Sequence, residues 1–389
     1  MAAARDFDIV VFGATGFTGE LTAEYLAEHA PADCRWALAG RSTAKLEAVR
    51  TRLAAINPAC AELPLLHADV SDPASLASVA ASTKVVITTV GPYLQFGEPL
   101  VAACAAAGTD YVDLTGEPEF VDLMFLAHQD EAVASGARIV HACGFDSIPH
   151  DLGVFFTMKQ LPAGEKATVR GVVRSGAQFS GGTFHSAMGA MSRQGQAKKA
   201  LSERRKKETR PAGRSARWVQ GKPGRDALLG YWLLPMPTID PLVVTRSAAA
   251  LDSYGPDFSY SHFAGLKTLR YTIGGSVAVG SLVLAANIPP LREALKKRVK
   301  QGEGPSSERR AKSWFTVDFV GEAGGKTVHT RVSGGDPGYT ETAKMLAESA
   351  LCLAFDDNPP SAGQVTTATA MGDNLLSRLQ KAGITFEVV

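Results

Sequence analysis

The segment FDIVVFGATGFTG, residues 7–19, joins a short apolar run to three glycines spaced G-x-x-G-x-x-G. Apolar residues at helical spacing follow through His29, so the segment predicts a buried strand, a tight turn and a helix. Glycines in such a turn let backbone N–H groups approach a pyrophosphate, and the helix N-terminus adds partial positive charge. The alternative interpretation is a plain turn between strand and helix. The residues predicted to contact a dinucleotide are Gly13, Thr15, Gly16, Phe17, Thr18 and Gly19.

Further strand-like runs follow before residue 150, and helical patterns separate them. These runs are residues 35–39, 63–67, 84–90, 111–114 and 138–142. Strands that alternate with helices predict a parallel, doubly wound sheet with right-handed crossovers. We therefore expect an α/β protein whose residues 1–148 form a Rossmann dinucleotide-binding domain.

The second strand-like run indicates which nucleotide binds, because Arg41, Ser42 and Lys45 follow its end. An NAD site places a carboxylate there, whereas an NADP site needs positive charge for the 2′-phosphate. A guanidinium, a hydroxyl and an ammonium suit a phosphate, so the sequence predicts NADPH. The alternative is that Arg41 is only a solvated loop residue. Beyond the third and fourth runs, we expect Asp69, Val70, Val90, Gly91 and Pro92 to border the cofactor.

The second part of the chain is less regular and predicts an α+β domain with a mixed sheet over residues 149–345. Residues 167–173 and 314–320 alternate as strands do, and 326–332 continue the latter as a hairpin. Residues 302–310 predict an exposed loop. Helical patterns at 339–353 and 373–382 predict a C-terminal segment, 346–389, that packs back on the Rossmann domain.

The distribution of charge also divides the chain into a first, acidic part and a second, basic part. Residues 1–150 hold 8 basic and 19 acidic side chains, whereas residues 151–389 hold 32 and 20. The five cysteines are scattered and include no C-x-x-C pair, which favours reduced thiols in a cytoplasmic protein and gives no support for a metal site. No apolar signal-peptide core follows the N-terminus, which also favours the cytoplasm.

Two segments of the second part indicate partners. Residues 193–225 hold 12 basic and 2 acidic side chains, and they are interpreted as a solvated face, an anchor for a carrier-linked phosphate, or a contact for anionic lipid. Residues 271–291 carry no charge, and three interpretations stay open: a membrane span, a buried helix, or an interface helix that would suit a homodimer. Nucleic acid is a poor fit, because the basic stretch has one aromatic residue, Trp218.

Several longer motifs then carry a family likeness. Four motifs accompany GATGFTG: AGRS at residues 39–42, TTVGPYLQFGEPLVAACAAAGTDYVDLTGE at 88–117, HACGFDSIPHDLG at 141–153, and the C-terminal TATAMGDNLLSRLQKAGI. Together they resemble the saccharopine dehydrogenase-like oxidoreductases, and among these the trans-acting enoyl reductases of mycobacterial type. The resemblance implies an NADP-type Rossmann domain, a second α/β domain often used for pairing, and reduction of a double bond in a polyketide- or lipid-like substrate.

Reduction of an enoyl group needs a proton source beside the nicotinamide. The Tyr-x-x-x-Lys pair of short-chain dehydrogenases is absent, which leaves Tyr93, Asp146 and His150 as catalytic candidates. Each has a structural alternative: Tyr93 packs on the cofactor, Asp146 caps the next helix, and His150 pairs with Asp151. Glu117 could likewise cap the helix that begins near Pro118.

The sequence leaves three functions open. The first is an NADPH-dependent reductase of a large, apolar, carrier- or lipid-linked substrate. The second is a saccharopine-type C–N oxidoreductase of amino acids, which should require paired cations that residues 143–153 do not offer. The third is a non-catalytic, lipid-associated protein that retains the nucleotide-binding fold.

Overall fold

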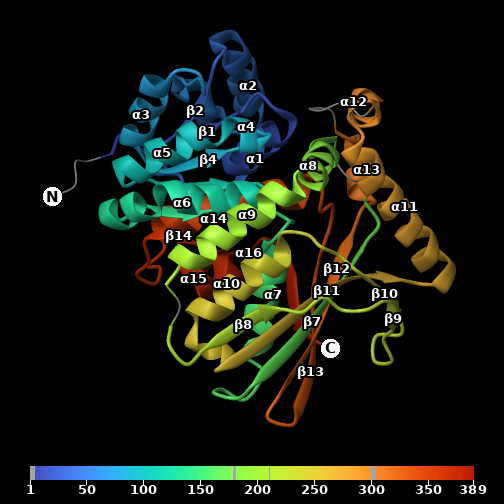
Figure 1. The fold of residues 1–389 in the computed structure, drawn as a ribbon. Helices are drawn as coiled ribbons and strands as arrows, with labels where there is room; N and C mark the ends of the chain where they lie inside the picture. Colours follow the sequence, from blue (N-terminus) through green and yellow to red (C-terminus); the bar gives the residue numbers. More distant parts are fainter. Residues whose placement is uncertain (1–4, 178–180, 210, 299–303) are drawn as a thin grey trace.

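The computed structural model describes residues 5–177, 181–209, 211–298 and 304–389. Figure 1 shows a body built around sheet A and, below it, a second body built around sheet B. The helices and strands of the first body are β1 (Phe7–Phe12), α1 (Phe17–His29), β2 (Trp36–Gly40), α2 (Thr43–Ile56), β3 (Leu65–His67), α3 (Pro73–Ser82), β4 (Thr83–Thr88), α4 (Tyr93–Phe96), α5 (Glu98–Ala107), β5 (Asp110–Asp113), α6 (Pro118–Ser135) and β6 (Arg138–Val140).

The remaining elements run from the domain junction to the C-terminus. They are α7 (Ile148–Met158), β7 (Ala167–Ser175), α8 (Gly181–Ser192), α9 (Gln194–Lys207), β8 (Ser215–Trp218), β9 (Gly224–Arg225), β10 (Trp232–Pro235), α10 (Asp240–Ala250), β11 (Asp257–Leu266), α11 (Leu269–Asn287), α12 (Pro289–Arg298), α13 (Ser307–Ala311), β12 (Phe315–Ala323), β13 (Lys326–Gly334), α14 (Thr340–Phe355), β14 (Gly363–Val365), α15 (Thr367–Ala370), α16 (Gly372–Lys381) and β15 (Thr385–Val388).

Sheet A is the predicted Rossmann sheet, with the strand order β14-β6-β5-β4-β1-β2-β3 and every pairing parallel. The interior strand β1 pairs with β2 on one side and β4 on the other, so the strand order reverses beside β1. Helices cover both faces, which is why Ile9, Val10 and Val11 are all fully buried. A reversal of this kind opens a ligand crevice at the carboxyl ends of the strands.

Sheet B is mixed, as the sequence predicts for the second domain. Its order is β15-β13-β12-β7-β11-β10-β9, and β8 pairs with β11 outside this path. The β12–β13 hairpin is confirmed, with Val317 opposite Val332. Strand β7 runs antiparallel to β12 and parallel to β11. The long strand β11 and the helix α10 before it were not predicted.

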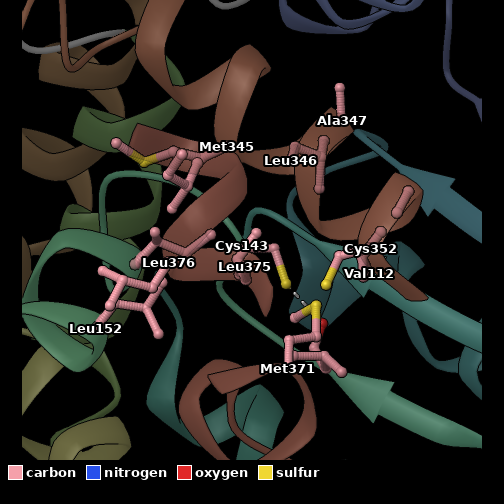
Figure 2. Packing of buried hydrophobic residues seen from close by; sticks show 14 of the residues in the cluster. Val112, Cys143, Leu152, Met345, Leu346, Ala347, Cys352, Met371, Leu375 and Leu376 are labelled. Carbon is pink, nitrogen blue, oxygen red and sulfur yellow. Dashed lines mark hydrogen bonds between the residues drawn. The ribbon is translucent and has the colours of Figure 1, made fainter. Parts of the chain in front are cut away.

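The C-terminal segment joins both bodies. Strand β14 extends sheet A beside β6, and α14 contacts α1 and β4, so the predicted return to the Rossmann domain is confirmed. Strand β15, however, pairs with β13 in sheet B, and the predicted boundary at residue 345 falls inside α14. In Figure 2, Met371 and Leu375 meet Val112 and Cys143 in one core, which explains why this segment folds with both bodies. All five cysteines are free thiols.

Two segments differ from their predictions. Residues 302 and 303 of the predicted loop lie outside the described residues, but the loop's last part is helical, as α13. The uncharged segment forms α11, the one helix in the described part of the chain that is long and apolar enough to cross a membrane. Only 18% of its apolar window is buried, so the interpretation as a buried helix is wrong.

Candidate cofactor and active site

The glycine turn between β1 and α1 forms the cradle that a pyrophosphate requires. Gly13 has a φ of +92°, which favours glycine, and its carbonyl oxygen accepts a hydrogen bond from the Gly16 amide at 3.0 Å. Gly16 is the N-cap residue of α1. A Cβ atom on Gly19 would lie 2.2 Å from the Gly13 oxygen, so only glycine fits there. The turn therefore leaves the N-terminus of α1 open to an anion, and a dinucleotide fits the residues present.

Residues from the second body pack beside this turn, against Phe17. Phe17 meets the ring of Tyr339 edge-on, with 4.8 Å between centroids, and the Arg310 guanidinium lies 5.4 Å from the Phe17 ring centroid. Sequence analysis missed both partners because they lie about 300 residues away along the chain. The cradle is thus built by α1 and packed from outside by α13 and the residue before α14.

The residues predicted to hold the 2′-phosphate lie just beyond the end of β2. Arg41 and Lys45 are exposed, and the Ser42 hydroxyl accepts a hydrogen bond from the Lys45 amide as the N-cap of α2. Asp69 follows β3 on the same edge of the sheet, and its carboxylate accepts hydrogen bonds from the amide and hydroxyl of Ser71. These bonds lower the pKa of Asp69, with a smaller contribution from Arg41. The arrangement leaves both cations free of ion pairs among the described residues, as a phosphate site needs.

Beyond β4, residues Val90, Gly91 and Pro92 lead into α4, and the Gly91–Pro92 peptide is cis. The Tyr93 hydroxyl donates to the Thr88 carbonyl and accepts from the Leu114 amide, both at 3.1 Å. Burial raises the pKa of this phenol well above its usual value. Because its proton is already donated to the backbone, Tyr93 joins the ends of β4 and β5, and the structure gives no support to its prediction as a proton donor.

Glu117 is the N-cap residue of α6, at the position the sequence predicts, but its side chain makes no capping hydrogen bond there and holds the start of α4 instead. Its carboxylate accepts from the amides of Tyr93 and Leu94, at 3.2 and 3.1 Å. The Ser186 hydroxyl of α8 also donates to Glu117, at 3.1 Å. The carboxylate thus connects the end of β4 to the second body.

Asp146 lies in the turn after β6, at the carboxyl edge of sheet A. Its carboxylate lies against Gly116, where a Cβ atom would come within 2.9 Å of Oδ2. Burial raises the pKa of Asp146 to about 6; the charge of Asp240 adds to this, and His150 opposes it. The next helix, α7, has Ser147 as its N-cap residue, so the alternative that Asp146 caps it is wrong. Asp146 therefore keeps a protonated fraction of about a tenth at pH 7, far more than an ordinary aspartate.

His150 pairs with a residue that its neighbours in the sequence do not reveal. Its Nδ1 atom lies 2.8 Å from Oδ1 of Asp240 on α10, and His262 Nε2 lies 3.6 Å from Oδ2 of the same carboxylate. Burial by itself would raise the pKa of Asp240, but the two histidines outweigh this effect and lower it. Burial lowers the pKa of His262 to about 4. The predicted pairing of His150 with Asp151 is wrong.

Asp151 instead fixes the C-terminal segment. Its carboxylate accepts from the hydroxyls of Ser247 and Thr367, at 2.5 and 2.7 Å, and from the Ala368 amide at 2.8 Å. Burial raises the pKa of Asp151 in spite of these bonds. The carboxylate is fully enclosed, so its role is structural.

His150, Asp240 and His262 are also residue types that bind zinc, and their ligand atoms lie within 4.8 Å of one another. The direct 2.8 Å contact between His150 and Asp240 leaves no space for an ion between them, because each ligand lies about 2.0–2.2 Å from zinc in a tetrahedral site. We therefore interpret the cluster as a buried charge network.

Comparison with known proteins agrees with this geometry. Residues 9–140 match the model of the saccharopine dehydrogenase NADP-binding domain. A protein of Mycobacterium tuberculosis H37Rv that is provisionally named a trans-acting enoyl reductase is 41% identical, over 99% of this chain and 98% of that protein. The trans-acting enoyl reductase of Mycobacterium ulcerans is 37% identical, over 98% of each chain. The chain belongs to the trans-acting enoyl reductase family.

The family assignment confirms the predicted cofactor class, and the protein is an NADP-dependent oxidoreductase. Saccharopine dehydrogenase of Saccharomyces cerevisiae, in its apo form, shares the fold with a TM-score of 0.57 at 14% identity, over 98% of this chain and all of that chain. At that identity the match shows the fold alone.

Part of the basic stretch pairs with acidic residues inside the fold. Helix α9 packs along the acidic helix α6. Arg193 pairs with Glu119 at 2.6 Å, Lys207 pairs with Asp130 at 2.8 Å, and the buried Arg204 lies against Asp122. The opposite charges of the two parts of the chain therefore meet at an internal contact, which sequence analysis did not consider.

One further buried group was missed. The Asp113 carboxylate at the end of β5 accepts from the Tyr111 hydroxyl and contacts His141 Nδ1 at 2.7 Å. It also accepts from the amides of Thr115 and Ala142. This carboxylate holds together the ends of β5 and β6, from which Gly116 and Asp146 extend.

Proposed function

We propose that the protein reduces a carbon–carbon double bond conjugated to a thioester carbonyl, in a polyketide- or lipid-like acyl substrate, with NADPH. The names of its relatives support this reaction class, and the acidic group at the carboxyl edge of sheet A supports the proton transfer. NADPH supplies a hydride when bound. The protein must then deliver a proton to the α-carbon and exclude water.

Asp146 carries the proposal. A general acid works best when its pKa lies near the working pH, and the pKa of Asp146 is raised to about 6. Its carboxyl donates a proton to the α-carbon while the β-carbon receives the hydride, and the carboxylate regains a proton from solvent. Of the three catalytic candidates, Asp146 is the one whose carboxyl lies against Gly116, in the turn after β5.

His150 and Asp240 act as positioning residues. The charge of Asp240 raises the pKa of Asp146, and His150, which lies 2.8 Å from that charge, opposes the rise. The Phe145 ring meets the His150 ring edge-on, at 5.7 Å between centroids, which fixes the turn that carries Asp146.

The experiment follows NADPH oxidation with a soluble enoyl thioester of coenzyme A. We expect oxidation by the wild type, and a loss of about 10²–10⁴-fold in kcat for Asp146→Asn, because general acid catalysis contributes that much. Tyr93→Phe is the matched control: it should lower stability, because the Leu114 amide loses its acceptor, yet retain kcat within a few fold.

Two results would contradict the proposal. Oxidation of NADPH by a keto acid with an amino acid, but not by enoyl thioesters, would favour the saccharopine-type reaction. Tight NADPH binding without turnover of any enoyl thioester would favour the non-catalytic, lipid-associated alternative.

A further inference from the structure

Three large apolar side chains of helix α11 point away from the protein. Ile273, Val277 and Leu284 recur at intervals of four and seven residues and so share one face, where they are 58%, 65% and 69% exposed. On the opposite face, Thr272 and Ala286 are buried, and Gly275 lies against Leu234 of β10. Leu282 and Val283 on that face are half-buried. Figure 1 shows α11 at the outer side of the second body. A helix face whose large apolar residues are this exposed marks a contact with an apolar medium.

Positive charge borders this apolar face at both ends. Lys267 and Arg270 lie at its start, and Arg292, Lys297 and Arg298 lie on α12 beyond it. No acidic residue occurs between residues 269 and 292. On α12, Lys297 and Arg298 are exposed, whereas Arg292 is half-buried and pairs with Glu293 at 3.3 Å.

The strands on either side of α11 exclude a single crossing of a membrane. Strand β11 precedes α11 and strand β12 follows α13, and both pair with β7 in sheet B. A crossing helix would place β12 on the far side of the bilayer, and the described part of residues 288–314 contains no second helix long enough to return. The helix can therefore lie only along a surface.

Charge distinguishes a lipid surface from a second copy of the chain. In a two-fold symmetric pair the same face meets itself, so the cationic ends of one copy would meet those of the other. An anionic bilayer accepts the apolar stripe between its headgroups and attracts the same cations.

We infer that α11 and α12 form a docking surface, which we call the α11 surface, for the face of an anionic lipid bilayer. Ile273, Val277 and Leu284 enter the headgroup region, and Lys297 and Arg298 contact phosphate groups. Helix α11 contacts α8, whose Ser186 holds Glu117 beside the cofactor edge, so docking brings the active site close to the bilayer. The inference that the substrate comes from the bilayer rests on the proposed function, whereas the inference that the protein docks there does not.

The experiment measures co-sedimentation of the full chain with vesicles of phosphatidylcholine alone and with 30 mol% phosphatidylglycerol, about a third of the lipid. We expect binding to the anionic vesicles, weakened by 0.5 M salt because exposed charges are then screened within about 4–5 Å. Val277→Glu with Leu284→Glu should reduce binding by about tenfold or more, and Lys297→Glu with Arg298→Glu by a similar factor.

Matched controls carry the same changes elsewhere. Val133→Glu with Leu228→Glu alters two apolar residues that are 50% and 56% exposed, and Lys198→Glu with Lys199→Glu alters two exposed cations of α9. Both controls should bind vesicles like the wild type. All variants should retain NADPH binding and turnover of a soluble enoyl thioester, which separates docking from the reaction.

Three results would overturn the inference: equal binding to neutral and anionic vesicles, equal losses in the controls, or resistance of the bound protein to alkaline carbonate extraction. A dimer in solution that Val277→Glu with Leu284→Glu dissociates would assign the α11 surface to a second copy instead.

Discussion

Nδ1 of His150 lies 2.8 Å from Oδ1 of Asp240, inside the protein and 90 positions away along the chain. The contact joins α7, which follows the Rossmann sheet, to α10, which belongs to the second body. It places a fixed negative charge near Asp146, whose pKa it helps to raise. The meeting of the two bodies therefore adds to the effect of burial on the pKa of the proposed proton donor.

Asp240→Asn tests this relationship through the pH profile of kcat/KM. Removal of the charge lowers the pKa of Asp146, so the alkaline limb of the profile should move to lower pH, and each unit of that shift costs about tenfold in rate at neutral pH. Asp151→Asn removes a buried carboxylate that does not contribute to the pKa of Asp146. It should lower the melting temperature and leave the limb in place. A limb that moves equally in both variants would contradict the assignment.

Asp146 and His262 should have opposite effects on the pH dependence of stability. The raised pKa of Asp146 makes the folded state hold its proton more tightly, so stability falls as pH rises from about 4 to 6. The lowered pKa of His262 makes the unfolded chain bind more protons between about pH 4 and 6.5, so this contribution rises with pH. Each effect amounts to about 2–3 kcal/mol, so the two nearly cancel.

His262→Gln should reveal the contribution of Asp146 alone. Between pH 4.5 and 6.5, we expect its free energy of unfolding in urea to fall by about 2 kcal/mol relative to the wild type. The free energy of unfolding of Asp146→Asn, relative to the wild type, should rise by a similar amount over the same interval. Parallel curves for the three proteins would show that neither group titrates as described.

Arg41→Ala tests the nucleotide preference. Loss of a guanidinium from the 2′-phosphate should weaken NADPH binding by about 10–100-fold and leave NADH binding nearly unchanged. Arg52→Ala on α2 is the matched control, because the Arg52 side chain pairs with Glu20 at 2.7 Å. Fluorescence titration with both nucleotides measures the effect. Equal weakening of NADPH and NADH by Arg41→Ala would mean that Arg41 is only a solvated loop residue.

Gly19→Ala tests the cradle. Its Cβ atom would lie 2.2 Å from the Gly13 carbonyl oxygen, so α1 must move away from β1, and we expect a loss of about 2–4 kcal/mol in stability together with loss of NADPH binding. In Gly16→Ala the nearest heavy atom is 3.5 Å from the new Cβ atom, so the melting temperature should change little. Thermal unfolding measures both, and an equal fall in the two variants would argue against the cradle geometry.

The sequence by itself determined the Rossmann sheet, the glycine turn and the choice of NADPH. These features are local: a buried strand, a turn and a helix start lie within residues 7–29, and the cations follow β2 directly. The hairpin β12–β13 is local in the same sense, since the register follows from its short turn. Such patterns can be read because each residue contacts neighbours along the chain.

Tertiary structure alone decided the partners of buried polar groups and the surroundings of apolar ones. His150 pairs with Asp240 and not with Asp151, and Asp146 is not the N-cap residue of α7. Glu117 is the N-cap residue of α6, yet its side chain bonds the start of α4. Ile273, Val277 and Leu284 of α11 face outward, although their spacing would fit a buried helix equally well. A carboxylate or a leucine has the same sequence signal whatever lies against it, and the free energy of burial depends on contacts that only the packed chain provides.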